Sequence, residues 1–228
     1  MRQDEGHQQN QEHEQYMAEY TAAYKKLHNK GDDMRTSNSG GDFKLAPSGM
    51  HVARCFKLID CGTHENKKFG GMQHLGYIFW ELPNKLIDEG EYKDQPFVVR
   101  KQYNLSHNEK ATLRLDLENW YGKTFDTAAL DGAGGFHLNK VMGRPAMLNI
   151  VHSDDGKYAN IKNVNPLPDG IECPPPFNEQ FTYELGDETI DQLSEKMREF
   201  IETAQEFEQE SGPVSEDLSQ DFDDDIPF

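Results

Sequence analysis

Residues 50–164 change their hydrophobic period twice, and this pattern constrains the fold more than any other feature of the sequence. Apolar and β-branched residues first recur in short runs typical of strands, then at helical spacing, then again in short runs. Turn-forming residues separate the runs. The pattern predicts five strands, at Met50–Asp60, Gln73–Leu82, Phe97–Leu105, Ala146–His152 and Tyr158–Val164.

One amphipathic helix is predicted between the third and fourth strands. Ser106 and Glu109 have the spacing of a capping box, which places the N-terminus of the helix at Ser106. Leu113, Leu117 and Trp120 follow on one face, so Trp120 is expected in the core rather than on a stacking surface. Gly122 is expected to end the helix. Three strands, a helix and two strands form the element order of an OB-fold, a small, partly open five-stranded barrel, although other small α+β folds share this order.

Charge is distributed unevenly along the chain. The 228 residues include 23 basic and 41 acidic ones, which gives a formal net charge of −18. Residues 43–170 hold 16 basic and 15 acidic residues, whereas residues 171–228 hold 2 and 18. The acidic character therefore belongs to the C-terminal part, and the central domain can present a basic face to an anionic ligand.

Composition also indicates the domain organisation. Residues 1–42 are rich in Gln, Glu and His and are predicted to be a flexible extension, and 43–170 form the folded domain. Residues 171–213 combine a Pro-rich linker with an amphipathic helix at 187–209, which either packs on the barrel or serves self-association or a partner. Residues 214–228 are predicted to be a disordered acidic tail that docks partners.

The last eight residues combine acidic side chains with an apolar ending. An acidic run ends in Ile-Pro-Phe, so an aromatic ring can enter an apolar pocket while carboxylates meet basic residues on its rim. A purely solubilising tail is the alternative, but it leaves the apolar ending unexplained. This ending resembles the C-terminal tip of bacterial single-stranded DNA-binding proteins. The resemblance implies partner binding by eight residues, namely Asp221, Phe222, Asp223, Asp224, Asp225, Ile226, Pro227 and Phe228.

Residues 45–170 also resemble a family of phage single-stranded DNA-binding proteins with an OB-fold core. The segments that carry this resemblance are Pro47–Gly62, Phe79–Leu82, Leu105–Gly122 and Leu148–Ile161, followed by Pro166-Leu167-Pro168. It implies a protein that coats and protects single-stranded DNA, without sequence specificity, during replication, recombination and repair. Its tip would recruit replication and repair proteins of the phage or its host. A strand-annealing recombination mediator and an adaptor that only docks partners are the alternatives.

Single-strand binding requires cations for phosphates and exposed rings for bases. On the second strand, alternation places Ile78, Trp80 and Leu82 in the core and turns Tyr77 and Phe79 toward a ligand; a shift of one residue would invert this assignment. The third strand contributes Arg100 on its polar face. The remaining candidates for nucleic-acid contact are Arg54, Lys57, Lys67, Lys68, Phe69, Lys101 and Tyr103.

Other functional classes have little support in the sequence. It contains no metal-ligand spacing, no P-loop and no GxSxG motif, so neither an enzyme nor a cofactor or metal is expected. Three cysteines without a CxxC motif indicate reduced thiols and a cytoplasmic location, which is the host cytoplasm for a phage protein. No membrane partner is expected, and the sequence leaves both a monomer and a homo-oligomer open.

Overall fold

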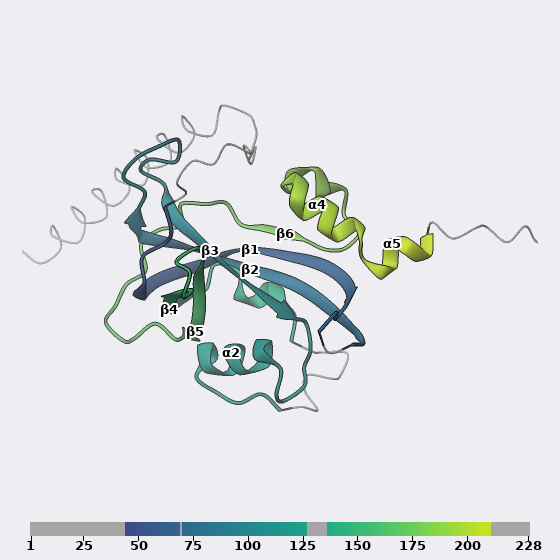
Figure 1. Cartoon of the computed structure of the whole chain (residues 1–228). Coiled ribbons are helices and arrows are strands. Elements are labelled where there is room, and N and C mark those ends of the chain that lie inside the picture. Colours follow the sequence, from purple (N-terminus) through teal and green to yellow (C-terminus); the bar gives the residue numbers. More distant parts are fainter. Residues whose placement is uncertain (1–43, 69, 127–135, 211–228) are drawn as a thin grey trace, which may run out of the picture.

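A computed structural model describes residues 44–68, 70–126 and 136–210 (Figure 1). The protein is mainly β, with one sheet in which the first five strands are antiparallel and follow the order β3-β2-β1-β4-β5. A short sixth strand pairs with β1 in parallel. The strands are β1 (Gly49–Glu65), β2 (Met72–Leu86), β3 (Pro96–Asn104), β4 (Pro145–His152), β5 (Ala159–Asn165) and β6 (Phe181–Tyr183).

The five predicted strands are confirmed in place, but the first two are longer than expected. β1 continues to Glu65, and β2 continues past Pro83 to Leu86. The β2–β3 pairing shifts register between Leu82 and Leu86, so Pro83 lies where the ladder is interrupted and its missing N–H breaks no regular pairing. Proline therefore does not end this strand.

β1 is long enough to pair with β4 along one stretch and with β6 along another. Irregularities in its pairing with β2 lie between Cys55 and Lys57 and between Asp60 and Gly62. Such bulges bend a strand and increase its twist. The first half of β1 pairs with β4, and the stretch from Lys57 to Ile59 pairs with β6.

The main core lies between the inner face of the sheet and helix α2 (Thr112–Tyr121), which covers one side of the sheet in Figure 1. Trp120 is 1% exposed, its ring centre lies 5.8 Å from that of Trp80, and its Nε1 donates a hydrogen bond to the carbonyl of Pro145 at 2.8 Å. The predicted core position of Trp120 is confirmed. So are those of Ile78, Trp80 and Leu82.

The predicted start of the helix is wrong. Helix α2 begins after Ala111, not at Ser106. The backbone N–H of Asn108 bonds to the Ser106 hydroxyl, and the backbone N–H of Lys110 bonds to the Asn108 side chain. These local bonds offer the backbone an alternative to a helical turn. The predicted end at Gly122 is confirmed, with a left-handed φ of 65°.

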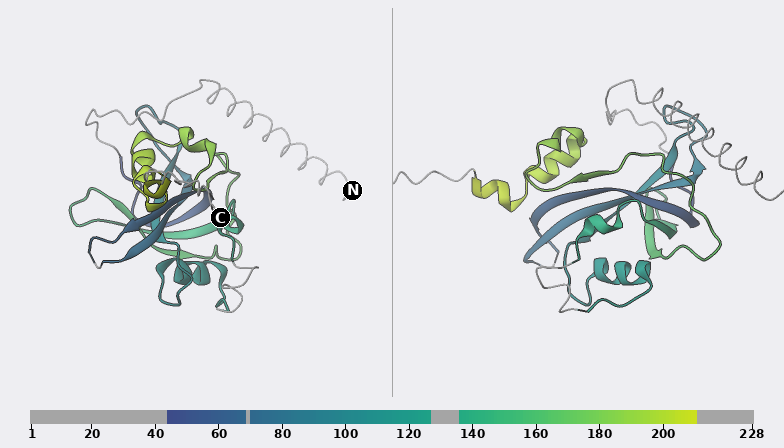
Figure 2. Two further views of the ribbon diagram at one scale, coloured as in Figure 1. Left: turned by 90° about the vertical axis from the view of Figure 1, so that its right-hand side faces the viewer. Right: turned by 180° about the vertical axis from the view of Figure 1, so that it is seen from behind.

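Residues 171–207, here called the C-terminal strap, run along the outer face of the sheet, opposite α2 (Figure 2). The strap contains β6, the short helix η2 (Glu188–Gln192), helix α4 (Glu195–Glu202) and the start of α5 (Gln205–Glu210). The single helix predicted over 187–209 is therefore wrong. Of its two predicted roles, packing on the sheet is the one observed, with Leu193, Met197 and Ile201 buried against Ile59 and Cys61.

Three polar contacts hold the strap in place. The Arg54 guanidinium donates hydrogen bonds to the carbonyls of Cys173 and Pro174. The Glu81 carboxylate, which is fully buried, accepts bonds from the backbone N–H groups of Phe177 and Asn178 and from the Asn178 side chain, at 2.7–3.0 Å. Near the other end of the strap, Glu206 accepts bonds from the backbone and hydroxyl of Thr63.

Two predictions fall on residues whose placement is outside the described ranges. These are the flexible extension at 1–42 and the acidic tail at 214–228 with its tip. Among the described residues, no helix is long and apolar enough to cross a membrane.

Candidate nucleic-acid interface

Four predicted contact residues meet on the outer face of the sheet, in what we call the outer-face cluster: Lys57, Tyr77, Phe79 and Arg100. In the strand register, Phe79 of β2 lies opposite Lys57 of β1 and opposite Arg100 of β3. A cation, a ring and a second cation thus form a row across three strands. Tyr77 lies two residues along β2 from Phe79, with 6.1 Å between the two ring centres.

Strand alternation explains why these side chains point outward. Ile78 and Trp80 are 1% and 0% exposed in the core, so their neighbours Tyr77 and Phe79 must point to the opposite face. On β3, Val98, Arg100, Gln102 and Asn104 are exposed, as the predicted polar face requires. The register is therefore the predicted one.

The two cations of the cluster lie over its rings. The Arg100 guanidinium is 5.0 Å from the ring centre of Tyr77 and 5.9 Å from that of Phe79. The Lys57 ammonium is 5.7 Å from the centre of Phe79. Within the described residues, neither cation forms an ion pair. Arg100 is exposed, so its charge is available to an anion, whereas Lys57 is only partly exposed.

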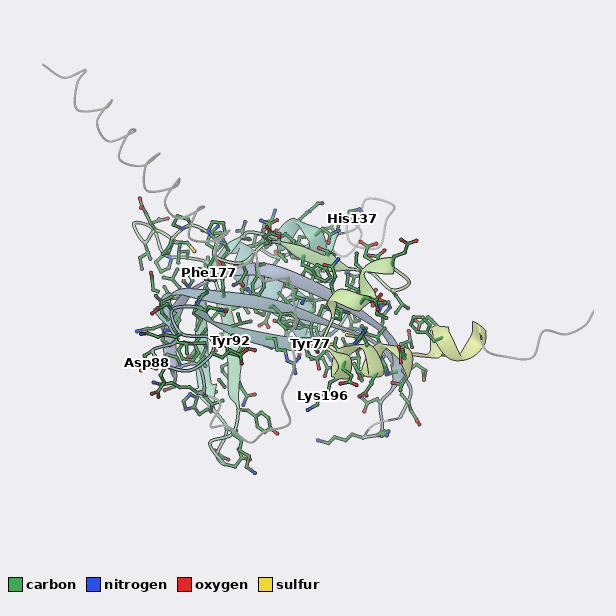
Figure 3. All side chains as sticks on the ribbon, turned by 90° about the horizontal axis from the view of Figure 1, so that it is seen from above. Tyr77, Asp88, Tyr92, His137, Phe177 and Lys196 are labelled. Atoms are coloured by element: carbon green, nitrogen blue, oxygen red, sulfur yellow. The ribbon has the colours of Figure 1, made fainter. Side chains whose placement is uncertain are left out.

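The C-terminal strap forms one side of this surface. Phe181 of β6 lies under the Lys57 ammonium at 4.8 Å, and Tyr77 and Phe79 pack against the apolar residues that the strap buries. Figure 3 shows Tyr77 next to the part of the strap that carries Lys196. Burial lowers the pKa of the Lys57 amine and raises the pKa of the Tyr77 hydroxyl. The two predicted rings are consequently half-buried.

Three other predicted contact residues are engaged elsewhere. Besides the strap carbonyls, Arg54 donates to the carbonyl of Gly143 at 3.0 Å, so its guanidinium serves to hold segments together. Lys101 and Tyr103 point to the inner side of β3, where both bond to the Asp116 carboxylate of α2, at 2.6 and 2.8 Å. Because these groups already have partners, we do not include them in the interface.

The loop between β1 and β2 carries the remaining predicted cations. Lys67 and Lys68 are exposed there. The loop is held by a bond from the backbone N–H of Asn66 to the carbonyl of Gly71 and by one from Gly70 to Asn66. Phe69, the predicted ring of this loop, lies outside the described residues.

Sequence reasoning missed two rings. Phe181 lies beyond the segment treated as the folded domain, and only the long-range pairing of β6 with β1 brings it to Lys57. Tyr158 was assigned to a strand but lies just before β5, in the β4–β5 connection, and is 63% exposed, more than the other large apolar or aromatic side chains described. Its position next to the turn at Asp155-Gly156 was the signal that could have placed it at a loop tip.

The described residues contain neither a cluster of metal ligands nor an activated thiol. They contain no group of three or more His, Cys, Asp or Glu side chains arranged to hold a metal ion. Burial raises the pKa of the Cys55 thiol, and it raises that of Cys61 to about 12, so neither thiol is an activated nucleophile.

No protein-family model matches the chain, and no curated protein matches it.

Proposed function

We propose that the protein binds single-stranded DNA, without sequence specificity, on the outer-face cluster of a partly open OB-type barrel. The bound strand would be protected during replication, recombination and repair. Bases would stack on Tyr77 and Phe79, and phosphates would lie on Lys57 and Arg100 and on the lysines of the β1–β2 loop. Stacking rings and a cationic path are what single-strand binding without sequence readout requires.

The path of the sheet supports the barrel. β3 and β5 are the two ends of the five-strand order, yet they come into contact, so the sheet curves round toward closure. The helix between β3 and β4 covers one side of this curved sheet. In OB-folds, the face of strands 2 and 3 and the loops between strands 1 and 2 and between strands 4 and 5 bind ligand. Tyr158 belongs to the latter loop.

The row of Lys57, Phe79 and Arg100 is the observation that carries the proposal. Two unpaired cations on either side of an aromatic ring, with a second ring beside it, match alternating phosphates and bases. A structural role would favour acidic partners for these cations, and the described residues provide none.

Titration of fluorescent poly-dT, compared with duplex DNA of equal length, tests the proposal. We expect preference for the single strand and a linear fall of log K with log salt concentration. Each contacted phosphate contributes about −0.7 to the slope, so Lys57, Arg100, Lys67 and Lys68 together predict a slope of about −3. Equal binding to duplex, or no binding at low salt, would contradict single-strand recognition and leave the adaptor alternative.

The proposal extends to residues 221–228, whose sequence fits a partner-docking peptide. The acidic ending would bind replication and repair proteins through its terminal aromatic residue and its carboxylates, and would hold them near the coated strand. Because the same acidic residues are attracted to the basic face of the domain, the tail would also compete weakly with DNA.

Deletion of Ser215–Phe228 is therefore expected to tighten single-strand binding at low salt. The effect should fade as salt is raised, because the Debye length falls from about 30 Å at 0.01 M to about 3 Å at 1 M. Fluorescence anisotropy of a labelled oligonucleotide across this range measures it. If the deletion leaves the affinity unchanged at every salt concentration, the tail does not compete with DNA. That result would contradict only the proposed competition and not the proposed DNA-binding site.

A further inference from the structure

A second group of rings and cations lies on the α2 side of the sheet, away from the outer-face cluster. We call it the α2-side cluster; it consists of Tyr121, Lys123, Phe125, Phe136, Lys140 and Arg144. The rings of Tyr121, Phe125 and Phe136 contact one another pairwise, with centres 5.2–5.7 Å apart. A cationic side chain lies over each of the three rings.

The cations occupy the faces of these rings. The Arg144 guanidinium lies 3.9 Å from the centre of Tyr121, the Lys140 ammonium 5.8 Å from that of Phe136, and the Lys123 ammonium 5.9 Å from that of Phe125. Lys123 and Lys140 are exposed. The Nε of Arg144 is buried and has no hydrogen-bond partner among the described residues.

No acidic residue of the described ranges forms an ion pair with the cations of this cluster, Lys123, Lys140 and Arg144. Glu118, the nearby acid of α2, already bonds to Arg114 and to the backbone of Phe125. Three cations that form no ion pair with a described residue lie on one surface of a chain of net charge −18, and they suit an anionic ligand.

A cavity of about 160 Å³ opens beside the rings. Phe125 and Phe136 line it together with leucines, and Ser106, His107 and Arg114 add polar groups. Predominantly apolar walls with a few polar groups are typical of small-ligand pockets, and unstacked bases bind in pockets of this kind. The rings and the cavity can thus bind a base, and the cations can bind the phosphate of the same nucleotide.

We propose that the α2-side cluster is a second contact for the same DNA strand. A base enters the cavity against Phe125 and Phe136, and the adjoining phosphates lie on Lys123, Lys140 and Arg144. This inference rests on the proposed function. α2 follows β3 closely in the chain and packs on its inner side, so a strand that leaves the outer face across β3 meets the surface of α2. We expect that an oligonucleotide short enough to occupy only the outer face does not contact the α2-side cluster.

The test compares two lengths of oligo-dT, of about 8 and about 30 nucleotides, the shorter lying within the 4–16 nucleotides that one OB-fold covers. The variant is Lys123→Ala/Lys140→Ala, in which both changes are exposed and leave the core untouched. For the longer oligonucleotide we expect the salt slope to become less steep by about 1.4, so that the affinity deficit grows about 25-fold for each tenfold dilution of salt. The shorter one should bind with unchanged affinity.

Lys85→Ala/Lys93→Ala is the matched control, because it also removes two exposed lysines, one near the end of β2 and one in the β2–β3 connection. Equal salt slopes for the two double variants on the longer oligonucleotide would overturn the second contact. Arg100→Ala separates this failure from that of the proposed function. If Arg100→Ala weakens both lengths while Lys123→Ala/Lys140→Ala changes neither, only the inference fails. If wild-type protein does not bind single strands, the proposed function fails.

Discussion

Replacement of both Tyr77 and Phe79 by leucine is expected to weaken single-strand binding by at least about 30-fold. Base stacking on an aromatic ring contributes about 1–3 kcal/mol per base, and tenfold in affinity corresponds to about 1.4 kcal/mol. Leucine keeps an apolar side chain against the strap but offers no ring face. The measurement is anisotropy with oligo-dT at fixed salt, with thermal unfolding to verify that the variant is folded.

Tyr92→Leu is the matched control for this pair. It removes a partly exposed ring, 36% accessible, from the β2–β3 connection rather than from the outer-face cluster. The salt slope should stay near its wild-type value in Tyr77→Leu/Phe79→Leu, because the phosphate contacts persist. If the double variant binds as tightly as Tyr92→Leu, the outer face is not the stacking surface.

The second large effect is expected at Glu81. Replacing it with leucine should lower the free energy of unfolding by about 2–6 kcal/mol, because two part-buried backbone N–H groups, of Phe177 and Asn178, lose this fully buried acceptor at about 1–3 kcal/mol each. Glu81→Gln keeps one acceptor oxygen and should lie between leucine and wild type. Urea denaturation measures the loss.

Glu91→Leu provides the comparison, since Glu91 is an exposed glutamate in the β2–β3 connection. Limited proteolysis adds a local readout: cleavage between residues 171 and 180 should accelerate in Glu81→Leu and remain slow in Glu91→Leu. Superimposable urea curves for the two variants would show that the buried carboxylate does not hold the strap.

Local patterns were sufficient to predict the five strands and their faces. Strand alternation has a period of two, so the runs around Trp80 and Arg100 determine which side chains share a face, and burial of Ile78 and Trp80 on one side follows directly. The left-handed conformation at Gly122 is equally local, because glycine is the residue that tolerates it.

Competition between local and long-range interactions explains the errors. Ser106 and Glu109 have capping-box spacing, but turn bonds of the Ser106 and Asn108 side chains prevail, and the helix starts later. In the C-terminal strap, Leu193 is extended and the Thr203 hydroxyl bonds back to the carbonyl of Phe200, so the predicted helix is interrupted at both places. The amphipathic character of residues 187–209 was predicted correctly, with Leu193, Met197 and Ile201 buried, but their backbone conformation was not.

Which side chains belong to the candidate interface was harder to predict than the strands that carry them. Arg54 and Arg100 are both arginines on strands. Nothing in their immediate sequence shows that Arg54 holds the strap, whereas Arg100 has no acidic partner among the described residues. The difference arises from carbonyls about 120 positions away in the chain. Likewise, the burial of Glu81 depends on Phe177 and Asn178, which lie almost 100 positions later.

The C-terminal strap also determines how far the protein can be shortened. A chain that stops near residue 170 would retain the five antiparallel strands and α2, yet would uncover Ile59, Cys61, Tyr77 and Phe79 and leave the Glu81 carboxylate without its three donors. Uncovered apolar faces of this kind favour aggregation. The minimal unit for expression and crystallisation therefore ends after Phe207, and trimming from this end should start from the acidic tail.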